Sequence, residues 1–170
     1  MNDNLMFRQP LVALWSVHPG DLLGEPIQFL SHGPVTHAGF LRGDFTTVHE
    51  NYFPKVRNRP LVDSEKAGIR LFRINGMTPA IADRFERYFD LAAEPQTALS
   101  YSIAGLFQYL VNRPPASEAD GLDCSAYANQ TVRRLVPELS LTMRCDDWQV
   151  SPRDLLISAR LTEISWADCS

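Results

Sequence analysis

The chain has little of what marks several protein classes. Only Lys55 and Lys66 are lysines, and the 16 cationic residues are scattered along 170 positions without a basic block. A nucleic-acid-binding surface needs clustered cations that release counterions, so this distribution and the net charge of −4 predict no nucleic-acid partner. No apolar run approaches the roughly 20 residues that a membrane-spanning helix requires. No integral membrane segment is therefore predicted.

The N-terminus lacks the pattern of a secretory leader, because no basic segment precedes an apolar stretch in residues 1–5. A cytoplasmic location is the expectation, with a non-classical export route as the alternative. The sequence contains no repeat, low-complexity segment or linker, so residues 1–170 are expected to form a single domain. A chain of this length buries roughly 70% of its unfolded surface and can fold without disulfides or metals.

The cysteines form no recognisable framework. Cys124, Cys145 and Cys169 are odd in number and widely spaced, with no C-x-x-C pair. This pattern favours a reducing compartment, with a Cys145–Cys169 bridge left open. A zinc site built from Cys124 and histidines is not expected, and neither a metal nor another cofactor is predicted.

Apolar periodicity predicts strands followed by helices. Four segments are predicted to be strands, with Gly43-Asp44 as a two-residue type II′ turn between the second and third: 11–17, 36–41, 45–50 and 69–74. Helices are predicted after Thr78-Pro79, at 101–111, from Cys124 onward and from Pro152 onward. This order indicates an α+β fold.

Cys124 is the cysteine with the clearest chemical context, because it follows a turn-rich segment and opens an amphipathic helix. A thiol at a helix N-terminus lies among unpaired N–H groups and at the positive end of the helix dipole, which favours the nucleophilic thiolate. Asp123 has opposing effects, since it can cap the helix while its charge disfavours a neighbouring thiolate. A lone cysteine is more often a small buried residue, so a catalytic role requires partners.

All four histidines precede Cys124 by at least 75 residues, so only the fold can bring a base to the cysteine. With the two-residue turn, His37 faces Glu50 on one side of the hairpin. Glu50 can then accept a hydrogen bond from His37 and fix its tautomer. His49 points to the opposite face, although a one-residue slip would place His49 or Asn51 across from His37 instead.

Five short segments occur in an order typical of one group of enzymes: His18-Pro19-Gly20-Asp21, Thr36-His37-Ala38-Gly39, Val48-His49-Glu50, Asp123-Cys124-Ser125-Ala126-Tyr127 and Ser151-Pro152-Arg153-Asp154-Leu155. The cysteine segment resembles the D-C-S-G-L nucleophile motif of NlpC/P60 cysteine peptidases, with Ala126 in place of glycine. Because His37 precedes Cys124, the order is similar to the circularly permuted papain-like branch. That branch comprises the YaeF/YiiX-like amidases and their relatives in the lecithin retinol acyltransferase group.

The resemblance implies a circularly permuted papain-like fold, in which a small antiparallel sheet packs against the cysteine helix. It implies a catalytic triad with Cys124 as nucleophile, His37 as base and Glu50 as third residue. The acyltransferase relatives often have histidine in the third position, and His49 adjoins Glu50. The Cys124 N–H is the natural oxyanion donor, and an aromatic residue in relatives suggests Tyr101 as a second donor. A core tyrosine at a helix start is the equal alternative for Tyr101.

These residues predict a cysteine hydrolase of the amidase or peptidase type, a thiol protease in its chemistry. The thiolate would attack an amide or ester carbonyl, and water would cleave the acyl-enzyme. A peptide or a lipid amide is the expected substrate. Two alternatives stay open: an acyltransferase that passes the acyl group to a lipid or amine, and a binding module that keeps the fold without turnover.

Overall fold

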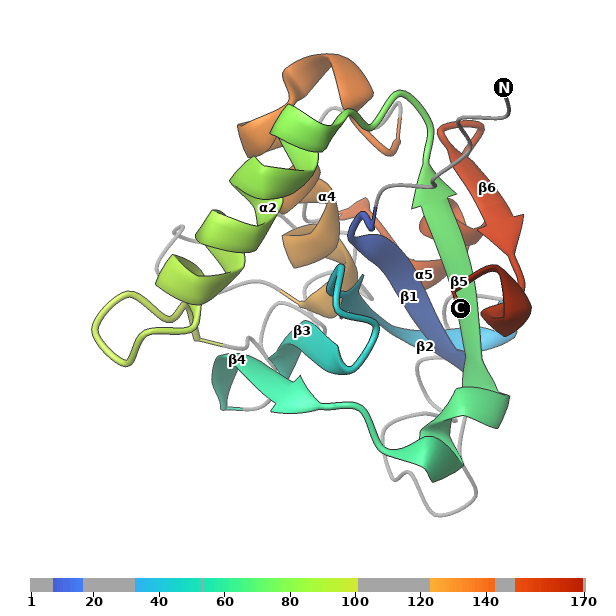
Figure 1. Cartoon of the computed structure of the whole chain (residues 1–170), viewed down its shortest axis with the longest axis horizontal. Helices are drawn as coiled ribbons and strands as arrows, with labels where there is room; N and C mark the ends of the chain where they lie inside the picture. The colour runs from blue at the N-terminus through green and yellow to red at the C-terminus, as the bar shows by residue number, and fades with distance from the viewer. Residues whose placement is uncertain (1–7, 17–32, 53, 101–122, 143–148, 170) are drawn as a thin grey trace, which may run out of the picture.

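The computed structural model describes residues 8–16, 33–52, 54–100, 123–142 and 149–169. Within these ranges, six strands form one antiparallel sheet in the order β4-β3-β2-β1-β5-β6 (Figure 1). The strands are β1 (Leu11–Ser16), β2 (Val35–Leu41), β3 (Thr47–Tyr52), β4 (Lys55–Pro60), β5 (Ile69–Ile74) and β6 (Leu161–Ile164). The fold is α+β, as the order of the sequence elements indicates.

The helices that the structure describes begin at local capping signals. They are α2 (Pro79–Ala92), α4 (Cys124–Leu135), α5 (Pro152–Leu156) and the 3-10 helices η1 (Asp63–Gly68), η3 (Pro137–Leu139) and η5 (Trp166–Cys169). The Thr78 side chain accepts a hydrogen bond from the Ile81 N–H at the start of α2. At the start of α5, the Ser151 side chain accepts one from the Asp154 N–H. The predicted starts of these helices are confirmed. The helix predicted at 101–111, with Tyr101, lies outside the described residues, as does Cys145.

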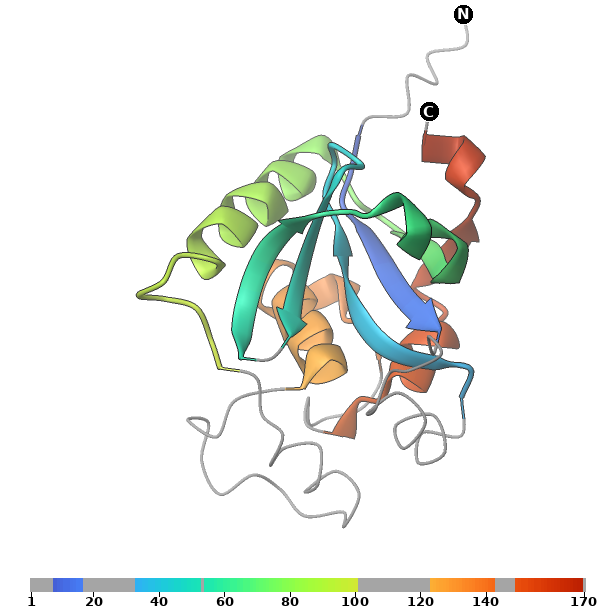
Figure 2. The ribbon, with the colours of Figure 1, turned by 90° about the horizontal axis from the view of Figure 1, so that it is seen from below.

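The central strands of the sheet carry buried residues on both faces. On one face, which we call the helix face, Val12, Leu14 and Phe40 pack against α2, α4 and α5. Figure 2 shows α2 and α4 together on this side of the strands. On the opposite face, Leu11, Ala13 and Trp15 of β1 pack with residues of β2, β3 and β5. Alternate residues of one strand therefore reach two separate cores.

The β2–β3 hairpin differs from the sequence prediction in its turn. The Arg42 N–H donates to the Thr47 carbonyl at 2.8 Å, so residues 43–46 form the loop and the predicted two-residue turn is wrong. The Asp44 carboxylate stabilises the wider loop, because it accepts hydrogen bonds from the N–H groups of Thr46 and Thr47 and from the Thr47 hydroxyl. Phe45 completes the turn with a positive φ of 56°.

The wider loop shifts the register of the hairpin by two residues. Glu50 pairs with Gly39, whereas the two-residue turn predicted His37 as its partner. An odd shift would have moved every side chain to the other face, but an even shift leaves each one on its predicted face. His37 and Glu50 are therefore diagonal neighbours on one face, at a separation that their side chains can bridge.

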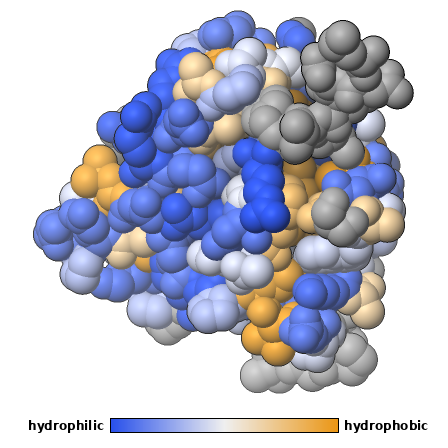
Figure 3. Space-filling model, in the orientation of Figure 1, coloured by the Kyte–Doolittle hydropathy of each residue, from blue (hydrophilic) through white to orange (hydrophobic). Residues whose placement is uncertain are grey.

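The surface of the side drawn in Figure 3 is mostly hydrophilic. None of the helices within the described ranges is long and apolar enough to cross a membrane. Cys124 and Cys169 are both free thiols.

Candidate active site

Cys124 is the first residue of α4, as the sequence predicts. Asp123 caps the helix: its backbone is extended, and its carboxylate accepts hydrogen bonds from the Ala126 N–H at 2.8 Å and the Ser125 hydroxyl at 3.0 Å. Cys124 is 4% exposed, and α4 packs against both β2 and β3. The thiol therefore lies at the positive end of a helix that rests on the two strands of the His37–Glu50 pair.

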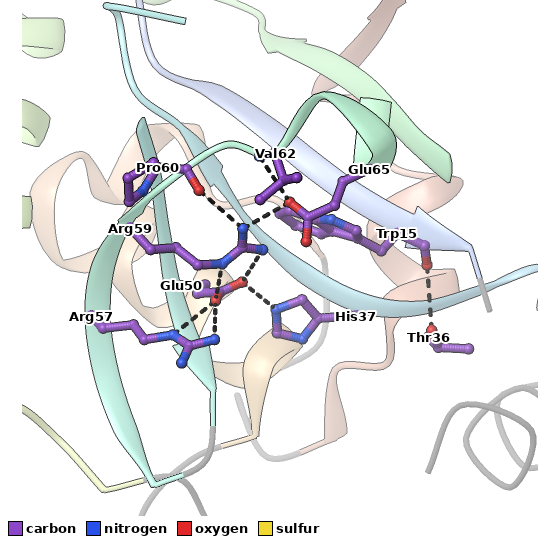
Figure 4. Close-up of polar contacts among 9 residues, drawn as sticks. All are labelled: Trp15, Thr36, His37, Glu50, Arg57, Arg59, Pro60, Val62 and Glu65. Carbon is purple, nitrogen blue, oxygen red and sulfur yellow. Dashed lines mark hydrogen bonds and ion pairs between the residues drawn. The ribbon is translucent and has the colours of Figure 1, made fainter. Parts of the chain in front are cut away.

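His37 links the helix to the sheet. Its Nε2 lies 3.1 Å from Glu50 Oε2 (Figure 4). Burial alone would lower the pKa of His37, but the charge and hydrogen bond of the Cys124 side chain, followed by those of Glu50, raise the pKa to about 10. Because Nε2 faces Glu50, Nδ1 is the ring nitrogen left for Cys124. The imidazole thus has an acidic partner on each side.

Aromatic rings hold the imidazole of His37 in place. Trp15, its partner on β1, lies with its ring centroid 5.1 Å from that of His37. Tyr52 meets the imidazole edge-on at 5.4 Å. The side chain of His37 is only 14% exposed. Its orientation is therefore set by packing as well as by hydrogen bonds.

Glu50 is a buried carboxylate surrounded by cations. It is 1% exposed, and besides His37 it accepts hydrogen bonds from Arg57 Nε and Nη2 at 3.0 and 2.8 Å and from Arg59 Nε at 2.7 Å (Figure 4). Burial alone would raise the pKa of Glu50, but the hydrogen bond and charge of His37, followed by those of Arg59, lower it well below its ordinary value. Glu50 therefore stays ionised at neutral pH.

Gly39 allows β3 to approach β2 closely beside the site. A Cβ at position 39 would lie 3.0 Å from the His49 carbonyl oxygen, 3.1 Å from Glu50 Cβ and 3.4 Å from the Trp15 ring. The first two separations are tighter than nine in ten real Cβ contacts, so a side chain here would force β3 to move by a few tenths of an ångström. Glycine at this position therefore sets the distance between the strand of His37 and the strand of Glu50.

His49 lies on the helix face, away from the His37–Glu50 pair. Its Nδ1 lies 2.7 Å from Asn58 Oδ1, and its Nε2 lies 2.7 Å from the Tyr127 hydroxyl. The ring also stacks on Phe89 with centroids 4.2 Å apart. Burial lowers the pKa of His49 to about 4, although the Asn58 hydrogen bond opposes this. Of the two candidates for the third residue, the structure brings Glu50 to His37 and places His49 in the core.

Asp123 adds a titratable charge next to Cys124. Burial raises the pKa of Asp123 to about 6, and the hydrogen bonds from Ala126 and Ser125 limit that rise. At neutral pH most of the Asp123 carboxyls are thus ionised. The carboxylate faces the first turn of α4, where the Ala126 N–H donates a hydrogen bond to it.

The sequence did not identify Arg57 and Arg59 as partners of Glu50. They alternate on β4, a strand that was not predicted because its polar residues, Lys55 to Pro60, do not resemble a buried strand. The available signal was the alternation of cations at 55, 57 and 59, which places three positive charges on one face if the segment is extended. Trp15 carried no local signal for its contact with His37.

No family model and no curated protein matches the chain. Among solved structures, the chain is similar to the metalloprotein YiiX from Escherichia coli O157:H7, with a TM-score of 0.65 and 13% sequence identity. The similarity covers 93% of this chain and 96% of that one. At this identity the likeness concerns the fold alone, and it agrees with the YiiX-like resemblance of the sequence motifs.

The metal content of that neighbour has no counterpart in the described part of this chain. No three His, Cys, Asp or Glu side chains among the described residues come together as a group that could hold a metal ion. The partners of His37 and Glu50 are instead a thiol and two guanidinium groups.

Proposed function

We propose that the chain is a cysteine hydrolase of the amidase or peptidase type, with a circularly permuted papain-like fold of the NlpC/P60 superfamily. The observation that carries the proposal is the position of His37, which bonds Glu50 through Nε2 and interacts with Cys124 at the N-terminus of α4. A nucleophile, a base and a group that orients the base are the components of a catalytic triad. The YiiX-like fold supports the proposal at the level of architecture.

In the acylation step, His37 holds the proton of Cys124, and the thiolate sulfur attacks the carbonyl carbon of an amide or ester. The electron pair of the C=O bond moves to oxygen, where N–H groups at the start of α4 stabilise the negative charge. When the intermediate collapses, the C–N or C–O bond breaks, and the leaving amine or alcohol takes the proton from His37. The product is a thioester on Cys124.

The two partners of His37 explain how one residue serves both halves of the reaction. Before acylation, the charge of Cys124 contributes to the high pKa of His37, so the ring keeps its proton and can deliver it to the leaving group. Formation of the thioester removes that negative charge and lowers the pKa of His37. The neutral ring then accepts a proton from water, the resulting hydroxide attacks the thioester, and Cys124 leaves as thiolate.

Glu50 acts as the orienting residue. It holds Nε2 of His37 and thereby directs Nδ1 toward the sulfur. Its own position is fixed by Arg57 and Arg59, which together donate to the same carboxylate. The carboxylate stays ionised throughout, so it stabilises the imidazolium without taking its proton.

The proposal is tested with activated esters, peptide amides and lipid amides as substrates and with intact-mass measurement of the acyl-enzyme. Cys124→Ala is expected to abolish turnover, with a loss of roughly 10³-fold or more, and to leave the melting temperature almost unchanged. Cys169→Ala is the matched control, because Cys169 is also a free thiol but lies on η5, outside the triad. Retained turnover in Cys124→Ala, or equal acylation of Cys169, would contradict the mechanism. Product analysis with and without an added amine or alcohol distinguishes hydrolysis from acyl transfer.

A further inference from the structure

β4 carries three cationic side chains on the face of the sheet that holds His37 and Glu50. Lys55, Arg57 and Arg59 alternate along this edge strand, while Val56 and Asn58 between them point to the helix face. The chain as a whole has a net charge of −4. Positive charge is thus concentrated beside the candidate site of a protein that is otherwise acidic.

Each of the three side-chain nitrogens of Arg59 has a structural partner, with Nη2 3.4 Å from Glu50 Oε2. Its Nε donates to Glu50 at 2.7 Å, and its Nη1 donates to the Pro60 carbonyl at 3.2 Å and to Glu65 Oε2 at 2.7 Å. Its side chain is 22% exposed. We therefore assign Arg59 to holding Glu50 in place.

Arg57 retains capacity for a further partner. Its Nε and Nη2 both donate to one oxygen of Glu50, Oε1, which Arg59 also uses. Within the described residues its Nη1 has no acceptor, and its side chain is 41% exposed. The Tyr52 ring lies 4.8 Å from the guanidinium carbon of Arg57 and fixes the plane of the group.

Lys55 extends the same surface toward solvent. It pairs with Tyr52 across the β3–β4 ladder, it is exposed, and it forms no ion pair with another described residue. Tyr52 is itself 46% exposed, and its ring contacts both His37 and Arg57. Arg57 and Lys55 are therefore accessible cations that neighbour Tyr52, whose ring contacts the imidazole.

We propose that Arg57 and Lys55 form a subsite for a carboxylate on the acyl donor, placed a few bonds from the carbonyl that Cys124 attacks. Arg57 Nη1 and the Lys55 ammonium donate to the carboxylate, and Tyr52 contacts the carbon chain between the two groups. The inference rests on the proposed hydrolase function and adds its preferred substrate class, acyl donors with a negative charge. A guanidinium that already shares its acceptor gains more from a new carboxylate than a fully paired one does.

Alkylation of Cys124 tests the subsite without turnover. N-(iodoacetyl)glycine and its amide react with a thiolate in the same way, with loss of iodide, but only the first carries a carboxylate, which lies four bonds from the carbon that the thiolate attacks. The ratio of their rate constants at Cys124, measured by mass spectrometry, is expected to fall roughly five- to tenfold in Arg57→Gln and in Lys55→Gln. Arg87→Gln removes the same charge from the exposed side of α2 and is expected to leave the ratio unchanged.

Turnover provides the second measurement, with the phenyl monothioester of glutaric acid and the methyl ester of the same compound as matched donors. If Arg57 acted only by holding Glu50, its substitution would lower kcat/KM for both donors in proportion. The subsite predicts instead that the ratio of the two kcat/KM values falls roughly tenfold, and that Arg57→Lys restores part of it.

The outcomes separate the two proposals. A reactive Cys124 whose rate ratios are unchanged in both Arg57→Gln and Lys55→Gln overturns the subsite and leaves the hydrolase standing. Ratios that respond to these substitutions, in a protein that turns over no donor, support the subsite and overturn the hydrolase. Failure of Cys124 to react with either alkylating probe overturns both.

Discussion

The buried imidazole of His49 predicts a specific loss of stability in acid. His49 is fully buried, with Asn58 at one ring nitrogen, Tyr127 at the other and Phe89 against its face. A proton added to this ring would create a charge in the core that no carboxylate among the described residues hydrogen-bonds. Burial accordingly lowers the pKa of His49 from its ordinary 6.5 to about 4.

The size and sign of the effect follow from these two values. The unfolded chain protonates His49 near pH 6.5, whereas the folded protein does so only near pH 4. The contribution of His49 to stability is therefore complete above pH 6.5 and is lost as the pH falls toward 4. At about 1.4 kcal/mol for each tenfold difference in proton affinity, the loss amounts to about 3 kcal/mol.

Urea unfolding at several pH values between 7 and 4 measures this loss, with His49→Gln as the reference because glutamine is neutral throughout. Glu50 also loses its stabilising charge in acid, since its folded pKa is lowered, but this loss occurs in both proteins and cancels in the comparison. Between pH 7 and 4 the wild type is expected to lose about 3 kcal/mol more than the variant. A parallel decline in both proteins, or an NMR titration of His49 with a midpoint near 6.5, would refute the reasoning.

Two further substitutions test the geometry around His37. Gly39→Ala places a methyl group about 3 Å from the His49 carbonyl and Glu50 Cβ. We expect the free energy of unfolding, measured by thermal denaturation, to fall by roughly 1–3 kcal/mol and kcat to fall as well. Wild-type values for both would contradict the close approach. Glu50→Gln leaves the guanidinium groups of Arg57 and Arg59 without their counter-ion. We therefore expect the free energy of unfolding in urea at pH 7 to fall by roughly 3–5 kcal/mol. Because the folded pKa of Glu50 is lowered, its contribution to stability is complete above about pH 4.5 and declines as the pH falls from there toward the lowered value. The difference between the two proteins should therefore shrink in acid, and a constant difference would contradict this origin.

The helix starts could be predicted from the sequence because their causes are local. Thr78, Asp123 and Ser151 each accept a hydrogen bond from an N–H three residues later, a contact that depends on four consecutive residues and not on the rest of the fold. The position of Cys124 at a helix N-terminus follows directly from the Asp123 cap. The same locality explains why Cys124 was the part of the candidate site that the sequence predicted most directly.

The hairpin register depends on contacts that the dipeptide Gly43-Asp44 does not reveal. Asp44 was expected to occupy the second position of a tight turn, but its carboxylate instead accepts three hydrogen bonds from residues 46 and 47. β3 is also paired along its whole length with β4, which fixes it from the other side. The prediction that His37 and Glu50 share a face survived because the error in register was even.

β4 and β6 could not be predicted because neither strand has the apolar pattern that marks a buried strand. In β4, the contacts with Glu50 on β3 require charged residues instead. Glu50 is ionised at 1% exposure, and an unpaired charge so deeply buried would be very unfavourable. The guanidinium groups that compensate it come from Arg57 and Arg59, so the residues that make β4 look unlike a strand are the ones that hold it in the sheet.

This arrangement couples the integrity of the candidate site to the docking of an edge strand. If β4 separated from β3, Glu50 would lose both guanidinium partners while keeping only His37. Its proton affinity would rise, and a protonated Glu50 would stabilise the imidazolium less. Since the high pKa of His37 depends on Glu50 as well as on Cys124, the imidazole would then hold its proton less firmly. The charge state of His37 therefore depends on β4 through Glu50, although β4 acts on Cys124 only through these two residues.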